Sequence, residues 1–488
     1  MAPTKKLQIS QEAFDAVVNE NVEEFGMEME EALADAVTTF QLQGVDLSGI
    51  ITDGGGGASL ESHPIIESIN AIRSAVASLC GEDLATTASV VEFCNSSQPT
   101  EEVIPSTVES CIVKGLDTLR VACRDEKTNN ASLAERHDAL EVVLAAVKAL
   151  TRSGASSLAS GLAALCSCLT GDRSREKFLH CNGPRIVFEA LSVEELSAEV
   201  VQQGAEALAA SAQKNEDVKD AYVHLKVHEV LVHQLRKHHN DAGAVQGVCD
   251  ALRSLVTADD ERIAASRTFQ NGMLIAKAGA MDTLLDTAHL QSKSAPILAS
   301  LCSAIKNLAV NDEICKSVAD RGGLNLVSRF LTTSMEQNNR VMARSTCILL
   351  IQLAGSDDNK DAFVMLGGLD QLVSLMTVFS EDPSVIQEAL TAIAVITLRS
   401  PSNASQAMKA GVVDITAEMM EKHVKVANLQ RQACKLIRNL AVRNLENRPI
   451  ILEKGLEKLI RLAKTNHEAC DDAASAALRD LGFDDYNV

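Results

Sequence analysis

The chain has 488 residues, of which 46% are hydrophobic and 23% are charged, as in an ordinary soluble protein. Aromatic residues make up only 3%, there is no Trp, and there are only nine Pro. This composition favours many similar helices packed through aliphatic side chains and argues against a β-rich fold. The formal net charge of −21 argues against a nucleic-acid partner, because binding to phosphates requires clustered Lys and Arg.

The Cys residues and the N-terminus indicate the compartment. The first ten residues, MAPTKKLQIS, lack the apolar core of a signal peptide, and no uninterrupted apolar run reaches ~18 residues. The thirteen Cys are therefore expected to be reduced thiols. We expect a cytoplasmic protein, with a nuclear location left open, and no membrane partner.

The N-terminal part of the chain is acidic. Residues 10–43 are expected to form two amphipathic helices, with Phe14 and Phe40 in their apolar stripes. The first sixty residues carry eleven Asp and Glu against two Lys. Four consecutive glycines at 54–57 predict a flexible break, because glycine is costly to hold in a helix. The first segment is therefore predicted to cover residues 1–57.

The rest of the chain is predicted to be a repeat array. Residues 58–130 are expected to be a degenerate helical capping region, because the end units of a solenoid are atypical. In the array proper, AIKNLAVNDEICKSVADRGGLNLVSRFL (304–331) and LLIQLAGSDDNKDAFVMLGGLDQLVSLM (349–376) share one order of parts. Each runs from the end of an apolar helix through a polar turn, a short helix and a glycine break into an amphipathic helix.

This order of parts recurs at regular intervals. Equivalent stretches begin at residues 164, 207, 251, 304, 349, 392, 436 and 477. The spacing of about 44 residues predicts about eight stacked three-helix units over residues 131–488, because one unit cannot bury its apolar stripe alone. The interval from 251 to 304 is longer, which predicts a loop insertion at 257–279. Loops that project from a rigid array often carry function.

The units resemble armadillo repeats, which have three helices with a glycine between the first and the second. Two parts of the chain resemble one eukaryotic branch of this family. Residues 10–50 are similar to the N-terminal segment of its proteins, and the final units, QACKLIRNLA (432–441) and AALRDLG (476–482), are similar to their C-terminal repeats. The resemblance implies an all-α fold, a right-handed α-α superhelix of armadillo repeats preceded by an acidic helical segment. It also implies a role in protein interaction, and it supplies no catalytic residues.

In armadillo arrays the long third helix of each unit lines a concave groove, and the resemblance places partner-binding positions there. The candidate groove residues obtained in this way are Glu206, Asp250, Ser254, Ser303, Lys306, Asn307, Gln352, Thr391, Arg431, Lys435, Arg438 and Asn439. Only Asn307 and Asn439 keep the Asn of the importin-like Trp-x-x-x-Asn pattern, and the chain has no Trp. Binding of import cargo by that mechanism is therefore not expected.

The last part of the predicted groove is basic. Residues 421–464 contain eleven Lys and Arg against four Glu, and Arg431, Lys435 and Arg438 lie close together on one helix. An acidic segment of a partner could bind there, or the acidic N-terminal helices could fold back onto it. A solvated surface without a partner is the third interpretation.

Metal and catalytic sites have little support. His224 and His228 have the i, i+4 spacing of a metal pair, but no H-E-x-x-H arrangement is present. Cys166, Cys168, His180 and Cys181 have ligand chemistry but lack zinc-finger spacing, and a small core residue is the simpler role for Cys166 or Cys168. Since no phosphate loop or nucleophile–base pair is found either, we expect no enzyme, no metal and no cofactor.

The predicted function is a monomeric, non-enzymatic scaffold or adaptor for other proteins. It would bind an extended or helical segment of a partner in the groove. The alternative is a co-chaperone-like protein that holds exposed segments of a client.

Overall fold

The computed structural model describes residues 9–47, 50, 52, 63–81, 83–96, 104–124, 130–151, 155–291 and 294–484. These residues form helices and turns, with no extended strand among them. The chain divides into two compact units, residues 1–271 and 272–488. No single helix in the described ranges is long and apolar enough to cross a membrane.

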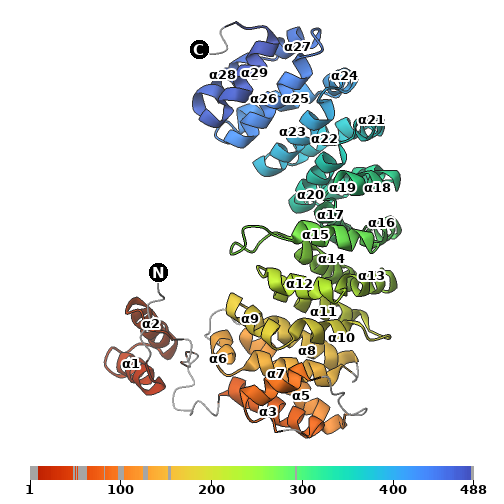
Figure 1. Ribbon diagram of the computed structural model, residues 1–488. Coiled ribbons are helices and arrows are strands. Elements are labelled where there is room, and N and C mark those ends of the chain that lie inside the picture. Colours follow the sequence, from red (N-terminus) through yellow and green to blue (C-terminus); the bar gives the residue numbers. More distant parts are fainter. Residues whose placement is uncertain are drawn as a thin grey trace. The chain divides into compact units, whose positions relative to one another are not determined.

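Unit 1 begins with a helical hairpin and continues as packed helical layers (Figure 1). Its helices in the described ranges are α1 (Gln11–Glu23), α2 (Met29–Leu42), α3 (Pro64–Cys80), α4 (Thr87–Asn95), α5 (Ser106–Cys123), α6 (Asn130–Arg136), α7 (Ala139–Leu150), α8 (Ala155–Cys168), α9 (Asp172–His180), α10 (Gly183–Leu191), α11 (Ala198–Ala212), α12 (Glu216–His224), α13 (Val227–Lys237) and α14 (Ala242–Val256). Helix α15 (Thr268–Lys277) begins in this unit and ends in the next.

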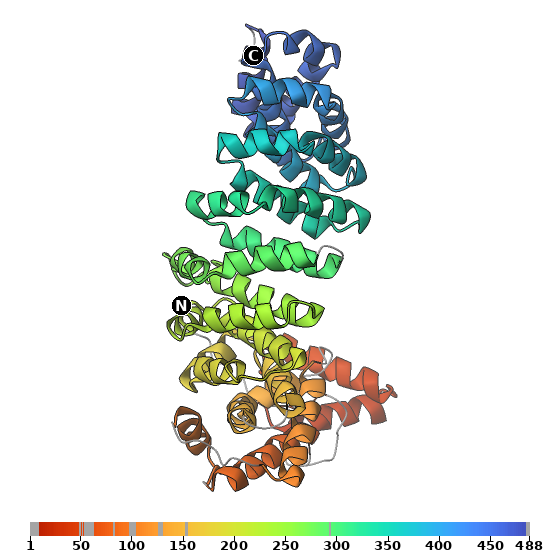
Figure 2. The ribbon, with the colours of Figure 1, turned by 90° about the vertical axis from the view of Figure 1, so that its right-hand side faces the viewer.

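Unit 2 consists of repeating helical layers throughout, coloured green to blue in Figure 2. Its helices in the described ranges are α16 (Ala280–Leu290), α17 (Ala295–Leu308), α18 (Asp312–Asp320), α19 (Gly323–Glu336), α20 (Arg340–Leu353), α21 (Asp357–Met365), α22 (Gly368–Val378), α23 (Pro383–Thr397), α24 (Pro401–Lys409), α25 (Val412–Lys422), α26 (Ala427–Ala441), α27 (Asn447–Glu453), α28 (Leu456–Asn466), the short 3-10 helix η2 (Glu468–Cys470) and α29 (Asp471–Leu481).

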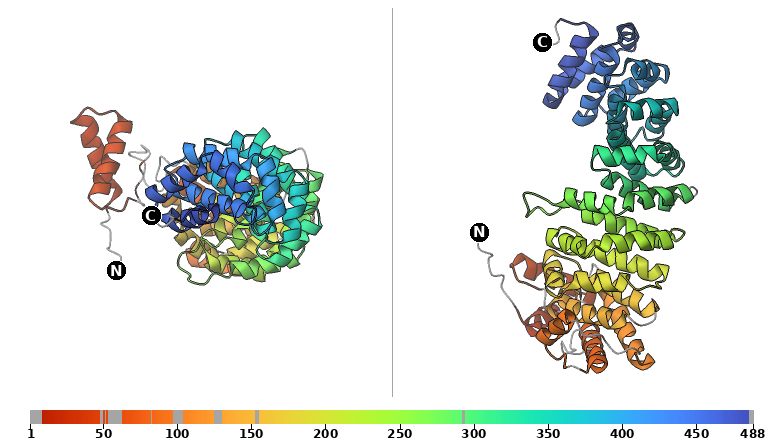
Figure 3. Two further views of the ribbon diagram at one scale, coloured as in Figure 1. Left: turned by 90° about the horizontal axis from the view of Figure 1, so that it is seen from above. Right: turned by 45° about the vertical axis from the view of Figure 1, so that its right-hand side comes forward.

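The third helices of successive repeats pack against one another in unit 2. Helix α17 contacts α20, α20 contacts α23, α23 contacts α26, and α26 contacts α29. We call the solvent-facing side of these five helices the third-helix face of unit 2. The second helices make a parallel series of contacts, from α16 through α19, α22 and α25 to α28. Figure 3 shows the same layers from two further directions.

The bend between the first and second helices of a repeat is formed by a residue in the left-handed backbone conformation, with positive φ. In unit 2 the bend before α19 is at Gly322 (φ 82°), and the bend before α22 is at Gly367 (φ 75°). Glycine adopts this conformation without a steric penalty. In unit 1 the same bend is made by Asn182 (φ 55°) and Lys226 (φ 59°). The use of Lys226 explains why the repeat that begins at residue 207 lacks the glycine signal.

The acidic hairpin at the N-terminus has a core of its own. Helices α1 and α2 pack side by side, with Phe14 and Phe40 buried between them at a ring-centroid distance of 5.9 Å (Figures 1 and 3). Val45 and Leu47, which follow α2, complete this core. The two helices agree with the prediction for residues 10–43.

The region 58–130, predicted as a capping region, contributes α3, α4 and α5. Helix α5 packs against α8, and α8 packs against α11, as third helices of consecutive repeats do. The long helix α3 packs against α5 in turn, so the stacking of long helices in unit 1 begins with α3.

Candidate functional site

Helix α26 has one apolar side and one basic side. Leu429, Ala433, Leu436 and Leu440 are buried at the i, i+4, i+7 and i+11 positions. Such a stripe packs a helix against its neighbours in the layer. The predicted residues Arg431 and Arg438 are exposed and Lys435 is half-buried, so all three lie outside the buried stripe.

The three basic residues differ in their contacts. Arg438 Nε donates a 2.9 Å hydrogen bond to Asp480 in α29, and Arg479 contacts the same carboxylate at 3.1 Å. Arg431 and Lys435, by contrast, make no ion pair with any residue that the structure describes. The uncompensated charge on α26 is therefore carried by Arg431 and Lys435, while Arg438 is part of a structural contact.

Helix α20 carries a basic residue at the position equivalent to Arg431. Arg344 occupies in its repeat the position that Arg431 occupies in α26, and it is also exposed without an ion pair in the described ranges. Apolar side chains accompany it on the same helix, since Val341 is 69% exposed and Ile348 is half-buried. The half-buried acid on the intervening helix α23 is Glu388. This part of the third-helix face of unit 2 is both basic and partly apolar.

The amide side chains on this face have different roles. Asn307 donates a 2.8 Å hydrogen bond to the carbonyl of Ser303 in its own helix. Asn439 donates a 2.8 Å hydrogen bond to the carbonyl of Ala394, in the third helix of the preceding repeat. The Oε1 atom of Gln352 is buried and has no hydrogen-bond partner in the described part of the chain.

The remaining predicted positions of unit 2 are half-buried on the third helices. Thr391 donates a 2.7 Å hydrogen bond to the carbonyl of Gln387, one turn earlier in α23. Ser303 and Lys306 lie on α17. The structure therefore places Ser303, Lys306 and Thr391 on the same series of helices as Arg431 and Lys435.

The predicted positions of unit 1 lie on α11 and α14. Glu206 accepts a 2.9 Å hydrogen bond from Gln202, and Asp250 accepts a 3.1 Å hydrogen bond from Arg253. Ser254 donates to the carbonyl of Ala251 at 2.8 Å. Since these polar groups have partners within their own helices, they offer less uncompensated charge than the basic residues of unit 2.

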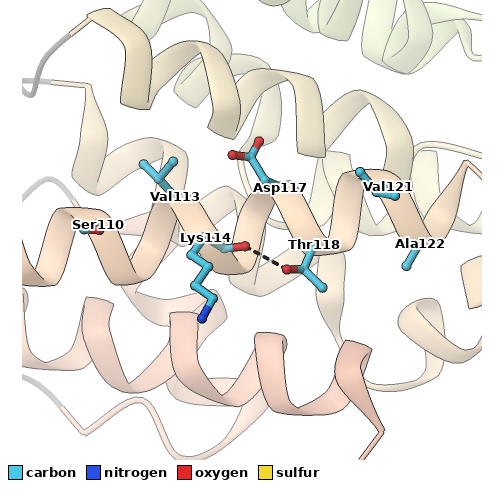
Figure 4. Close-up of a pocket in the computed structure, with 7 residues that line it drawn as sticks. All are labelled: Ser110, Val113, Lys114, Asp117, Thr118, Val121 and Ala122. Carbon is cyan, nitrogen blue, oxygen red and sulfur yellow. Dashed lines mark hydrogen bonds between the residues drawn. The ribbon is translucent and has the colours of Figure 1, made fainter.

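An open hollow of about 670 Å³ on α5 was not anticipated from the sequence. Figure 4 shows side chains of this single helix around it, with the Thr118 hydroxyl donating to the carbonyl of Lys114 at 2.9 Å. The lining residues are Ser110, Val113, Lys114, Asp117, Thr118, Val121 and Ala122. Ser110, Lys114, Thr118 and Ala122 are spaced four residues apart, and this spacing is the sequence signal that places them on one side of α5.

The predicted loop insertion at 257–279 is only partly a loop, because residues 268–277 form helix α15 and the loop itself covers residues 257–267. Buried ionic groups, which the sequence does not predict, hold this loop. The fully buried Lys219 of α12 donates from Nζ to the carbonyl of Thr257 at 2.6 Å and contacts the carboxylate of Asp259. Glu216, which is also buried, accepts hydrogen bonds from the Ser266 hydroxyl at 2.8 Å and from the backbone N–H of Arg267 at 3.1 Å. Sequence spacing cannot show these contacts, because they join α12 to residues 38 to 51 positions later.

A carboxylate completes the attachment of this loop. Asp260 accepts hydrogen bonds from the backbone N–H of Glu216 at 3.0 Å and from Arg262 Nε at 2.9 Å. Hydrogen bonding to the Arg262 guanidinium holds the pKa of Asp260 well below its usual range. The start of the loop is thus fixed to the N-terminus of α12, and Figure 1 shows the loop projecting beside the helical layers, next to α15.

The His and Cys residues that the sequence offers as metal ligands have hydrogen-bonded or buried surroundings in the structure. The His224 ring Nδ1 lies 2.7 Å from the carbonyl of Asp220, and burial lowers the pKa of His228. Burial raises the pKa of Cys181 to about 12, so this thiol stays protonated at neutral pH. Within the described ranges, no group of three or more His, Cys, Asp or Glu is arranged to hold a metal ion.

The fold resembles solved armadillo-type arrays. An engineered protein superposes with a TM-score of 0.61 at 20% identity, covering 85% of this chain and 99% of that chain. A chain from a study of the phosphorylation switch that controls the interaction between cadherin and beta-catenin gives a TM-score of 0.60 at 15% identity. That match covers 97% of this chain and 81% of the other. At these identities the likeness shows the fold alone.

Sequence comparison identifies the family. Armadillo repeat-containing protein 6 of Homo sapiens is 28% identical over 407 residues, which cover 81% of this chain and 75% of that protein. The homologue from Drosophila melanogaster is 25% identical, covering 80% of this chain and 77% of its own length. The model of the Armadillo repeat-containing protein 6 N-terminal domain matches residues 6–63, and the ARMC6 model matches residues 92–485. The chain therefore belongs to the ARMC6 family of armadillo-repeat proteins.

Proposed function

We propose that this protein is a scaffold that binds an acidic segment of a partner protein on the third-helix face of unit 2. The observation that carries the proposal is the pair of uncompensated cations on α26, Arg431 and Lys435, in a chain whose net charge is −21. Arg344 on α20 repeats the position of Arg431 two repeats earlier. The family and the fold are typical of proteins that bind other proteins rather than substrates.

The physical basis is local charge complementarity combined with exposed apolar surface. Surface cations that have no internal partner can pair with a ligand carboxylate without breaking an existing ion pair. Val341 and Ile348, which flank Arg344 in α20, provide apolar contact area beside the charge. Basic residues steer an acidic segment, and apolar contacts slow its dissociation. The partner segment is therefore expected to combine Asp or Glu with aliphatic residues.

The test is the double substitution Arg431→Glu/Lys435→Glu in the full-length protein, followed by quantitative affinity purification from cells. The matched control is Lys409→Glu/Lys458→Glu, which makes the same change of charge at exposed residues of the first and second helices. We expect the amount of a partner with an acidic segment that is recovered with the first variant to fall about tenfold or more, while the control variant recovers as much as the wild type.

Three outcomes separate the interpretations. Loss of one partner, or of a small set, only in the α26 variant supports the scaffold. Loss of a broad client set together with ATP-dependent chaperones supports the co-chaperone alternative. An unchanged set of partners, or the same loss in the control variant, shows that the third-helix face of unit 2 does not bind them.

A further inference from the structure

The N-terminal hairpin carries negative charge that nothing within it neutralises. Residues 9–47 contain ten Asp and Glu and no Lys, Arg or His. Among the residues that the structure describes, one ion pair reaches the hairpin from outside, between Asp46 and Arg136 of α6 at 2.8 Å. Like charges at this density repel one another, and a cationic ligand would relieve that repulsion.

The tip of the hairpin, which consists of residues 24–28 between α1 and α2 and of Met29 at the start of α2, is held in a defined conformation. The backbone N–H of Met27 donates to the carbonyl of Asn21 at 3.1 Å, and Gly26 provides the left-handed bend with φ 67°. The Asn21 side chain donates across the hairpin to the carbonyl of Ala32 at 3.3 Å and to Asp35 Oδ2 at 3.2 Å. This buried amide therefore ties the end of α1 to α2.

Two large apolar side chains are exposed at this tip. Met27 packs against the hairpin core, whereas Phe25 is 66% exposed and Met29 is 48% exposed. Both lie within a run of exposed carboxylates, Glu23, Glu24, Glu28 and Glu31. An aromatic and a thioether side chain of this kind are typical anchors of protein interfaces.

In the described part of the chain, the ion pair that joins the hairpin to the rest of unit 1 lies at the other end of the hairpin. Asp46, which pairs with Arg136, follows the C-terminus of α2, whereas the tip lies at its N-terminus. Because α2 has 14 residues, it separates the two ends by roughly 20 Å. The tip is thus presented to solvent by a hairpin whose opposite end makes the ion pair.

We propose that the hairpin tip is a second docking element, which binds a basic protein surface that contains an apolar pocket. Phe25 and Met29 would enter the pocket, and the surrounding carboxylates would pair with Lys or Arg at its rim. The sign of the charge selects the partner, since the ten acids have no basic residue among them. The hairpin tip would therefore recruit a basic partner, independently of the acidic segment proposed for unit 2.

The experiment uses the full chain and a defined probe, a fluorescent amphipathic helical peptide made of Lys and Leu. Two matched peptides serve as comparisons: a Lys and Ser peptide without apolar groups, and a Glu and Leu peptide of opposite charge. The protein variants are Phe25→Ala/Met29→Ala at the tip and Leu42→Ala at the opposite end of the hairpin. Leu42 is 84% exposed, so its substitution removes a comparable exposed apolar group.

We expect the Lys and Leu peptide to bind the wild-type protein and to bind the tip variant about tenfold or more weakly. Binding to the Leu42→Ala variant is expected to match the wild type, and binding should weaken as salt rises. Thermal unfolding should be unchanged, because the substituted side chains are exposed. The proposal is overturned if the peptide does not bind, if the tip variant binds like the wild type, if Leu42→Ala has the same effect, or if the Glu and Leu peptide binds as tightly.

Discussion

Asn439 in α26 donates a hydrogen bond of 2.8 Å to the carbonyl of Ala394 in α23 and so joins the third helices of two consecutive repeats. In the importin-like pattern, the Asn at this position binds the backbone of a peptide. Here at least one of its amide hydrogens is used within the array. Asn307, at the equivalent position in α17, is instead bonded within its own helix.

We therefore expect Asn439→Ala to destabilise unit 2 by about 1 kcal/mol, because it removes a bond between helices at a partly buried position. Urea-induced unfolding would measure the change, and hydrogen exchange of α23 and α26 would locate it. Asn307→Ala serves as the control and is expected to cost less, since its bond does not link two repeats. An equal cost for the two variants would contradict this assignment.

Lys219 predicts a larger effect in unit 1. Its ammonium group is fully buried and has Asp259 and Glu216 as counter-charges. Removing one member of a buried ion pair typically costs ~3–5 kcal/mol, because the remaining charge stays in a poorly solvated position. We expect Lys219→Met to lower the unfolding temperature and to increase hydrogen exchange throughout residues 257–267.

Lys237→Met is a suitable control for Lys219→Met. Lys237 pairs with Glu195 at 3.5 Å, and the Glu195 side chain is largely exposed. Such surface pairs contribute about 0–1 kcal/mol. If the two variants lose similar stability, the buried network does not hold the loop.

Asp260 makes the stability of unit 1 dependent on pH in the acid range. Its pKa in the folded protein lies well below the value of ~3.9 for an unfolded chain, because Arg262 bonds the ionised form. Stability from this group is therefore fully present above about pH 4 and is lost as the pH falls toward the folded-state value. The difference in unfolding free energy between the wild type and Asp260→Asn should be constant from about pH 7 to 5 and shrink below about pH 4.

Urea-induced unfolding at a series of pH values measures this difference. Other carboxylates also titrate in this range, and comparison of two chains that differ at one residue removes their shared contribution. A difference that does not change with pH would show that ionised Asp260 does not stabilise the fold.

The repeat architecture could be predicted from the sequence because it rests on local signals. A glycine such as Gly367 marks a left-handed bend, and apolar spacing marks the buried side of each helix. The same reasoning fails where a non-glycine residue makes the bend, as Lys226 does.

Contacts between repeats could not be predicted in this way. The sequence places Arg438 with Arg431 and Lys435 on one helix, but it does not show which of these cations has an internal counter-charge, because that depends on which acid the next repeat brings close. Asp480 lies 42 residues later in the chain and meets Arg438 only once α29 has packed against α26. The buried Lys219 network joins residues about 40 positions apart for the same reason.

The bend between α18 and α19 gives the last prediction. A Cβ atom at Gly323 would lie 2.6 Å from the carbonyl oxygen of Val318 and 2.5 Å from its Cγ1. Backbone atoms cannot move away without distorting the bend, so we expect Gly323→Ala to cost about 1–3 kcal/mol. The cost would appear as a lower unfolding temperature and faster hydrogen exchange in these two helices.

Gly355 provides the matched control in the same unit. The nearest atom to a Cβ there is the carbonyl oxygen of Gln352 at 3.4 Å, which is an ordinary contact distance. Because alanine restricts the unfolded chain more than glycine does, Gly355→Ala is expected to be neutral or to stabilise by up to about 1 kcal/mol. If Gly323→Ala were tolerated equally well, close packing at this bend would not be the reason that the repeat has a second glycine beside Gly322.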